Sequence, residues 1–182
     1  MSDVRIFIGI PTDDVLKEKL NIQQQDIKDF IKQGKMTAYE NFHLTMLFIG
    51  DMNEKDMDLM KEKLVLSLSH TKSFYFVLNR LGSFKKGDTK IMWVGDKEHH
   101  ELLQDLYQNI KQAVQQCHIS FQDSLFHPHI TLARQVKVMD DKRLDDQLFG
   151  PYPMKIGDVN IYLSSQVDGK LTYTPLHTIR LK

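Results

Sequence analysis

The chain has 182 residues, which is the length of one domain or of two small lobes that share a core. Its 24 lysine and arginine residues balance its 24 aspartate and glutamate residues, which excludes a protein that binds duplex nucleic acid by net charge alone. Hydrophobic residues make up 41% of the chain and charged residues 26%, and these proportions exclude bulk disorder.

The chain has one cysteine, Cys117, so an internal disulfide and an all-cysteine metal cage are excluded. No apolar run approaches the roughly 20 residues of a membrane span. The apolar stretch near the first residue is too short for a signal peptide. We therefore expect a protein of the reducing cytoplasm that has no membrane partner.

The predicted elements mix strands and helices. Residues 5–10 alternate and are rich in isoleucine, which is typical of a short strand, and Asp13 offers a cap for the helix that follows. Apolar spacing predicts helices over residues 15–31, 54–68 and 98–114. The third helix is expected to bury Leu102, Leu103, Leu106, Ile110, Ala113 and Val114. Further strands are predicted over residues 42–49, 74–78, 90–94, 126–133, 159–167 and 170–174.

Turn residues separate these elements. Gly50 is predicted to end the strand over residues 42–49, and Asn53 to cap the helix after it. Residues 81–88 are predicted to be a polar connection, and Asp168-Gly169 is a strong signal for a two-residue hairpin turn. Intermixed strands and helices with at least one hairpin favour an α+β fold over a doubly wound parallel sheet.

A short pattern occurs twice in the chain. The segments FHLTML, with His43 and Thr45, and PHITLA, with His129 and Thr131, share the order histidine, apolar, threonine, apolar. The two histidines lie 86 residues apart, close to half the chain. We therefore predict a single domain made of two duplicated lobes, over about residues 1–90 and 91–182. Their antiparallel sheets and helices would surround a central cleft. In one variant of this arrangement, each lobe contributes a terminal strand to the other. The two histidine strands should lie side by side about a pseudo-two-fold axis.

The histidines and threonines suit one kind of chemistry. In a strand, residues i and i+2 share a face, so His43 projects with Thr45, and His129 with Thr131. A neutral imidazole can take a proton from water or a hydroxyl while a protonated one gives a proton to a leaving oxygen. The threonine hydroxyls and the nearby Arg134 can hold phosphate oxygens. The pattern therefore predicts that a phosphodiester is broken between the two strands.

Other interpretations of the histidines stay open. His127 and His129 with His43 would make a three-histidine zinc site, although no aspartate or glutamate lies within the two motifs to support one. His127 is otherwise a supporting residue. A solvated surface position is expected for the remaining histidines His70, His99, His100 and His118, with His177 half-buried in the last strand. Cys117 is expected in the core. Phe84 and Trp93 are expected in the core or the wall of the cleft, although either ring could stack on a base.

Residues 41–50, NFHLTMLFIG, and residues 126–134, FHPHITLAR, closely resemble the two signature motifs of the 2H phosphoesterase superfamily. Within it they are most similar to the bacterial RNA 2′,3′-cyclic phosphodiesterases, also called 2′–5′ RNA ligases. Other stretches resemble the same family, so the likeness covers nearly the whole chain: residues 5–10, 81–84, 91–95 and 163–173.

The resemblance implies a bilobal α+β enzyme that needs no metal and no cofactor. It would open a 2′,3′-cyclic phosphate at an RNA end, for example on tRNA halves, to a 2′-phosphate. Members of the family also join or split 2′–5′ linkages, so the resemblance implies this activity as well. The implied acid–base pair is His43, as donor to the leaving O3′, and His129, as base for water, with the roles exchanged in the reverse reaction. The implied phosphate contacts are Thr45, Thr131 and Arg134, and the supporting residues are His127 and Phe48.

Some features of the sequence leave the substrate open. Met46 stands where the family has leucine, and residues 88–91 lack the arginine and proline common there, which bears on recognition beyond the phosphate. Lys85, Lys86 and Lys90 could form a local basic rim. Two other functions remain: hydrolysis of a small cyclic nucleotide or ADP-ribose cyclic phosphate, and an RNA-end binding module without catalysis. We expect a monomer.

Overall fold

The computed structural model of the chain describes residues 4–96, 98, 100–139 and 149–182. Its main sheet contains β1 (Val4–Pro11), β2 (Ile31–Met36), β3 (His43–Met52), β5 (Arg80–Lys86), β6 (Thr89–Gly95), β7 (His129–Val138), β9 (Asp158–Val167) and β10 (Lys170–Arg180). A second, two-stranded sheet pairs β4 (Phe74–Leu78) with β8 (Tyr152–Ile156). The helices are α1 (Asp14–Lys28), α2 (Glu54–Leu68) and α3 (Glu101–Gln116), with a short 3₁₀ helix, η1 (Tyr39–Asn41).

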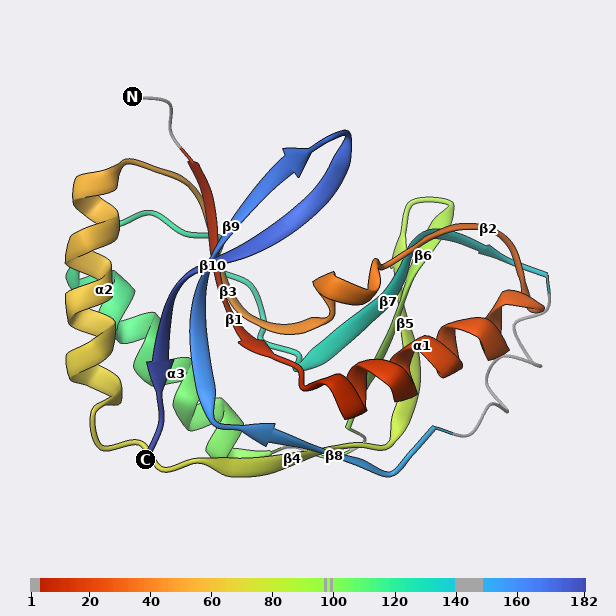
Figure 1. Cartoon of the computed structure of the whole chain (residues 1–182), viewed down its shortest axis with the longest axis horizontal. Helices are drawn as coiled ribbons and strands as arrows, with labels where there is room; N and C mark the ends of the chain where they lie inside the picture. The colour runs from red at the N-terminus through yellow and green to blue at the C-terminus, as the bar shows by residue number, and fades with distance from the viewer. Residues whose placement is uncertain (1–3, 97, 99, 140–148) are drawn as a thin grey trace.

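The main sheet is antiparallel and has the strand order β10-β9-β1-β3-β7-β6-β5, with β2 added on β7. The predicted α+β class with antiparallel sheets is confirmed. On one side of the molecule α2 and α3 lie with β1, β3, β9 and β10, whereas α1 lies on the other side with β2 and β5 to β7 (Figure 1). None of the helices in the described part of the chain combines the length and the apolar character needed to cross a membrane.

The two histidine strands meet at the centre of this sheet. Strand β3 pairs with β7 through Leu44 and Ile130, so the prediction that the two strands lie side by side is confirmed. Leu44, Ile130 and Leu132 are completely buried and Met46 is nearly so, which leaves the alternate residues to face away from the core. The end of the chain completes the other edge of β1, because β9 pairs with it. The division of the chain into lobes near residue 90 stays a prediction.

Several predicted boundaries are wrong, and tertiary pairing explains them. The first helix ends at Lys28 rather than at residue 31, because the chain turns there and Ile31 begins β2, which pairs with β7. Residues 81–88 are not a connection: the chain forms strand β5 and pairs with β6, and the turn is confined to Gly87 and Asp88. Strand β8 was not predicted, because Pro151 and Pro153 mask a short edge strand.

Smaller differences concern ends and exposure. Strand β7 begins at His129, not at residue 126, and β10 continues to Arg180. Helix α3 begins at Glu101, and its Leu102 is 54% exposed rather than buried, since it lies off the apolar face. The caps of α1 and α2, by contrast, are as predicted: the side chains of Asp13 and Asn53 accept hydrogen bonds from backbone N–H groups of the first turn.

The prediction that Gly50 ends its strand is wrong, because the strand continues past this residue. Strand β3 runs on to Met52 through an irregularity at which Ile6 pairs with Gly50 and Phe7 pairs with Phe48, so that Ile49 is an extra residue. Gly50 has φ +100°, a conformation that side chains rarely adopt. A second irregularity, at which Ile8 pairs with Leu47 and Gly9 pairs with Thr45, lies nearer to His43. The two bulges together set the alternation of β3 relative to β1.

We expect Gly50→Ala to destabilise the protein by about 1–2 kcal/mol, because a Cβ is strained at this φ even though no atom lies close to it. Urea unfolding measures the change in free energy. Gly157→Ala is the control: its Cβ would meet only the flexible Lys155 side chain, and we expect a change within about 0.5 kcal/mol. Equal effects of the two substitutions would contradict the role given to the bulge.

Candidate active site

The candidate site lies where β3 and β7 pair. Because Leu44 lies opposite Ile130 in an antiparallel pair, His43 occupies the position across from Thr131, and Thr45 the position across from His129. All four side chains are half-buried and lie on the face opposite the core. The sequence-predicted histidines and threonines are therefore brought together, related by a local two-fold relationship.

Both imidazoles are held in the same way. His43 Nδ1 lies 2.7 Å from the carbonyl oxygen of Asn41, and His129 Nδ1 lies 2.6 Å from the carbonyl oxygen of His127. A carbonyl oxygen only accepts hydrogen bonds, so Nδ1 carries the proton and donates in each case. Nε2 is then the atom left to exchange a proton. In His43 this atom lies 2.8 Å from the Thr45 hydroxyl, which donates to it while the ring is neutral.

Aromatic rings enclose His43. Phe7 lies 4.9 Å from its ring centroid, Tyr173 meets it edge-on at 5.0 Å, and Tyr162 lies at 6.0 Å. These rings come from β1, β10 and β9, so strands from both ends of the chain build this wall. A Cβ at Gly9 would lie 3.4 Å from both His43 and Tyr162, and glycine thus allows the close packing.

His129 has a similar setting on the other side. Phe84 meets its ring edge-on at 5.0 Å, and Trp93 lies at 6.0 Å. Trp93 is 3% exposed, as predicted for a core or wall residue. Its ring lies over Gly82, where a Cβ would collide with it. His127 is exposed and packs against Trp93 at 4.7 Å, so its ring supports this wall while its carbonyl holds His129.

The surroundings favour neutral histidines in the free protein. Burial lowers the pKa of His43 to about 4, against the opposing effect of its bond to Asn41, and the charges of Arg134 and His129 lower it further. Burial also lowers the pKa of His129, with smaller contributions from His127 and Arg134. Arg134 itself is exposed on β7, and its charge reaches both imidazoles and Tyr173.

Two pockets of different character flank these groups. One, of about 440 Å³, is largely apolar and is lined by Thr45, Phe48, Phe84, His127 and His129 together with Met46, Leu47, Tyr107, Gln122, Ser124, Leu125 and Phe126. The other, of about 600 Å³, contains Arg134, Asn41 and Tyr173. The predicted supporting residues Phe48 and His127 thus lie in the apolar pocket and Arg134 in the other, with the histidine motifs between them.

Sequence reasoning missed Asn41. Its side chain is 7% exposed and fastens strand β10: its amide nitrogen donates to the Leu171 carbonyl at 2.7 Å, and its oxygen accepts from the Tyr173 N–H at 3.3 Å. Its own carbonyl holds His43. The one sequence signal for this residue is its position two residues before His43, the same offset as His127 from His129.

The other histidines lie away from the site. His70 and His118 are exposed and His177 is half-buried, as predicted. His100 is not a solvated residue: its Nδ1 accepts from the Leu103 N–H at 3.3 Å, which caps α3, and its ring stacks on Phe74. His99 lies outside the described residues. Within the described part of the chain, no three histidine, cysteine, aspartate or glutamate side chains are grouped so that they could hold a metal ion.

Comparison with known proteins gives a consistent result. A family model described as the 2′-5′ RNA ligase superfamily matches residues 27–167. A Thermotoga maritima protein named RNA 2′,3′-cyclic phosphodiesterase is 29% identical over 89% of this chain and 87% of its own length. An Archaeoglobus fulgidus protein of the same name is 26% identical over 72% of each chain. The crystal structure of E. coli LigT in apo form has the same fold, with a TM-score of 0.84, 21% identity and coverage of 100% of this chain and 99% of that one.

The pKa of His43 predicts how stability depends on pH. A histidine whose pKa falls from 6.5 when unfolded to about 4 when folded binds its proton more tightly in the unfolded state. Stability is therefore full above pH 6.5 and is lost as the pH falls towards 4, by up to about 3 kcal/mol. His43→Gln removes this contribution, so urea unfolding should show a shallower loss of stability between these pH values. Parallel curves for the two proteins would contradict the buried, neutral histidine.

Proposed function

The chain belongs to the 2′-5′ RNA ligase superfamily, and on that premise we propose that it opens 2′,3′-cyclic phosphates at RNA ends to 2′-phosphates by acid–base catalysis between His43 and His129. The expected membership of the 2H phosphoesterases is confirmed, and the chain is an enzyme of that class. One observation carries the proposal: two imidazoles on adjacent strands, each with Nδ1 held by the carbonyl two residues before it and Nε2 left for proton exchange.

The reaction needs one proton to be taken and one to be given. His129 Nε2 removes a proton from water, whose oxygen attacks the phosphorus while the bond to O3′ breaks. His43 Nε2–H delivers a proton to O3′, so the 2′-phosphate and a free 3′-hydroxyl result. In the free protein the low pKa of His43 keeps this ring neutral, and the negative charge of a bound phosphate favours its protonated form. The same steps with the 5′-hydroxyl of a second RNA in place of water would form a 2′–5′ linkage, and run backwards they would split that linkage to the cyclic phosphate. Reversible 2′–5′ ligation is therefore part of the proposal.

The phosphate contacts follow from the same geometry. The Thr45 hydroxyl already lies 2.8 Å from His43 Nε2, so it is next to any phosphate that this nitrogen reaches. Thr131 holds the equivalent position on β7. Both hydroxyls can donate to non-bridging oxygens, where negative charge increases in the transition state. Arg134 adds a positive charge whose effect already extends to both histidines.

Two features support RNA as the substrate class. The Thermotoga maritima and Archaeoglobus fulgidus relatives are named for RNA 2′,3′-cyclic phosphates. The apolar pocket beside His129 also offers the rings of Phe48, Phe84 and His127 to a nucleobase, and stacking on such rings is tolerant of sequence. RNA ends that carry a cyclic phosphate, tRNA halves among them, are the proposed substrates, and the proposed location is the cytoplasm.

We expect His43→Ala and His129→Ala each to lower kcat by about 10²–10⁴-fold on a short RNA that ends in a 2′,3′-cyclic phosphate, in excess chelator. The double variant should lose little more than either single variant, because the two groups act as a unit. Product analysis should find a 2′-phosphate. His70→Ala is the matched control at an exposed position, and its activity should equal that of the parent.

Three results would contradict this mechanism. Full activity in either single variant would exclude the paired histidines. Loss of activity in chelator and its return with zinc would favour the metal interpretation based on His43, His127 and His129. Binding of the RNA without any turnover by the parent would favour the non-catalytic module.

The pH dependence of kcat/KM should be bell-shaped with its optimum below 6.5, because the pKa values of both histidines are lowered in the free enzyme. Arg134→Gln removes a charge that lowers both pKa values, so the optimum should move to higher pH while KM rises. Arg180→Gln, which removes an exposed partner of Asp158, should leave the profile in place. A flat profile between about pH 5 and 8, or no movement in Arg134→Gln, would contradict the proposal.

A further inference from the structure

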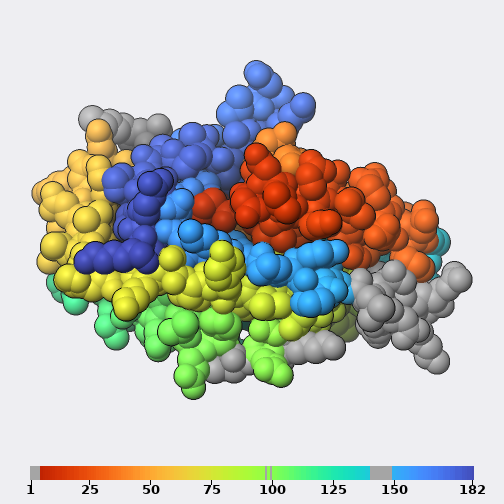
Figure 2. Space-filling model, turned by 60° about the horizontal axis from the view of Figure 1, so that its bottom comes forward, coloured from red at the N-terminus to blue at the C-terminus, as the bar shows by residue number. Residues whose placement is uncertain are grey.

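The 600 Å³ pocket on the Arg134 side of the site is built from parts of the chain that are far apart in sequence. Strand β2, the segment that leads into η1, the β5–β6 hairpin, β7 and the β9–β10 hairpin all contribute to its lining. Both hairpins point towards the same edge of the molecule in Figure 1, and the tip of the β9–β10 hairpin projects from the body of the molecule (Figure 2).

The charge of this pocket is unlike that of the chain as a whole. Lys35, Lys86, Arg134 and Lys170 line it, and no aspartate or glutamate does. All four are exposed, and in the part of the chain that the structure describes none of them pairs with a carboxylate. A chain with a net charge of zero has thus gathered in one pocket four cations that pair with none of the described carboxylates. The pocket beside His129 has no lysine or arginine in its lining.

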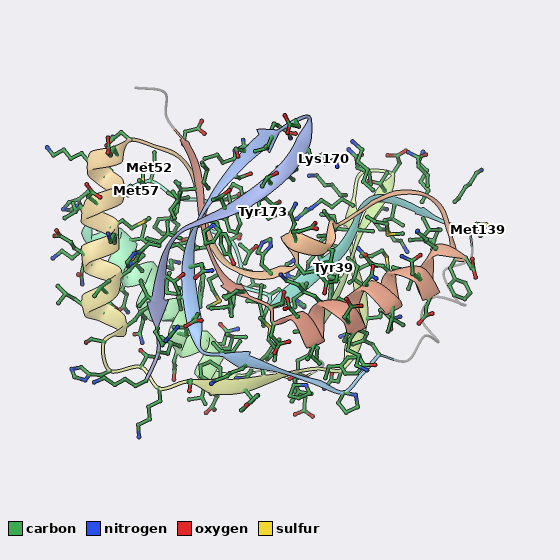
Figure 3. All side chains as sticks on the ribbon, viewed as in Figure 1. Tyr39, Met52, Met57, Met139, Lys170 and Tyr173 are labelled. Carbon is green, nitrogen blue, oxygen red and sulfur yellow. The ribbon has the colours of Figure 1, made fainter. Side chains whose placement is uncertain are left out.

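The basic pocket adjoins His43 through two of its lining residues. Tyr173 lines it and also meets the His43 ring at 5.0 Å, and Asn41 lines it while its carbonyl holds His43. From there the pocket extends along β10 to Lys170, which Figure 3 shows on the projecting hairpin, farther from the centre of the molecule than Tyr173. The pocket therefore begins beside His43 and leads away from it along β10.

We propose that this basic pocket binds the backbone phosphates of the RNA strand on the 5′ side of the cyclic phosphate, so that the enzyme selects an oligonucleotide end over a mononucleotide. The inference rests on the proposed function and adds to it the direction in which the strand leaves the site. With the cyclic phosphate between the histidines and the terminal base in the apolar pocket, the O5′ of the terminal ribose leads to the next phosphate. Unpaired lysines are suited to such phosphates, since they bind them without reading the base.

The test compares two substrates with the same terminal nucleotide: a nucleoside 2′,3′-cyclic phosphate and a short oligonucleotide that ends in one. The parent should have the higher kcat/KM on the oligonucleotide. Lys35→Gln with Lys170→Gln should raise KM for the oligonucleotide, leave its kcat unchanged and leave both constants for the mononucleotide unchanged. The dependence of log KM for the oligonucleotide on log salt should become shallower by about 1.4, since each lost phosphate contact on a single strand accounts for about 0.7.

Lys55→Gln with Lys61→Gln is the matched control, because both lysines are exposed on α2 at the far side of the molecule. It should leave KM and its salt dependence as in the parent. Lys170→Glu alone should raise the oligonucleotide KM more than Lys170→Gln does. If the parent shows no preference for the oligonucleotide, or if the pocket variant behaves as the control does, the inference is overturned and the proposed function stands.

Two further outcomes are decisive. If the pocket variant affects only the transfer of the cyclic phosphate to an RNA with a free 5′-hydroxyl, the pocket holds that second strand and the inference is wrong. If the parent hydrolyses neither substrate, the proposed function fails, but the pocket can still be tested by fluorescence anisotropy with a labelled 3′-phosphorylated oligonucleotide. Weaker binding by the pocket variant than by the α2 control would then support the inference, and equal binding would overturn it.

Discussion

The site depends on one hydrogen bond that occurs twice, from an imidazole Nδ1 to the backbone carbonyl two residues before it. The distances, 2.7 Å at His43 and 2.6 Å at His129, are short. Each bond joins the first residue of its strand to the segment that leads into that strand. Each fixes the tautomer of its ring and the direction of Nε2 without help from another side chain. The course of the backbone before each strand therefore matters as much as the histidine. In one copy η1 sets that course, and in the other Pro128 does.

The two hydrogen bonds are alike, and the rest of the site gives the two histidines their protonation state and their different surroundings. Aromatic rings and burial keep both imidazoles neutral in the free protein, and Arg134 adds to this effect. In the proposed mechanism an anion bound between them favours the protonated form, which couples substrate binding to protonation. The apolar pocket lies beside His129 and the basic pocket beside His43, and this asymmetry gives direction to a centre that is otherwise close to two-fold symmetric.

Sequence patterns were sufficient where they are local. The alternation in the two motifs placed Thr45 with His43 and sent Leu44 and Ile130 into the core, as the structure shows. They did not predict strands that form only by pairing with residues far away in the sequence. Strands β2, β5 and β8 are short or polar, and only their neighbours make them strands. The ring of Tyr173 and the bonds of Asn41 to β10 join residues about 130 positions apart, and no window of sequence contains both.

The pairing of β1 with β9 has a consequence for synthesis of the chain. Arg5 lies opposite Ser164, and the wall of His43 includes Tyr162 and Tyr173, so the first histidine receives its surroundings from residues that leave the ribosome long after it. A nascent chain that already contains both histidine motifs still lacks this wall. Until β9 pairs with β1, this edge of β1 has unpaired backbone groups, to which a chaperone or another chain can bind. The surroundings of His43 are therefore completed only after β9 and β10 have been synthesised and have joined the sheet, later than either histidine motif.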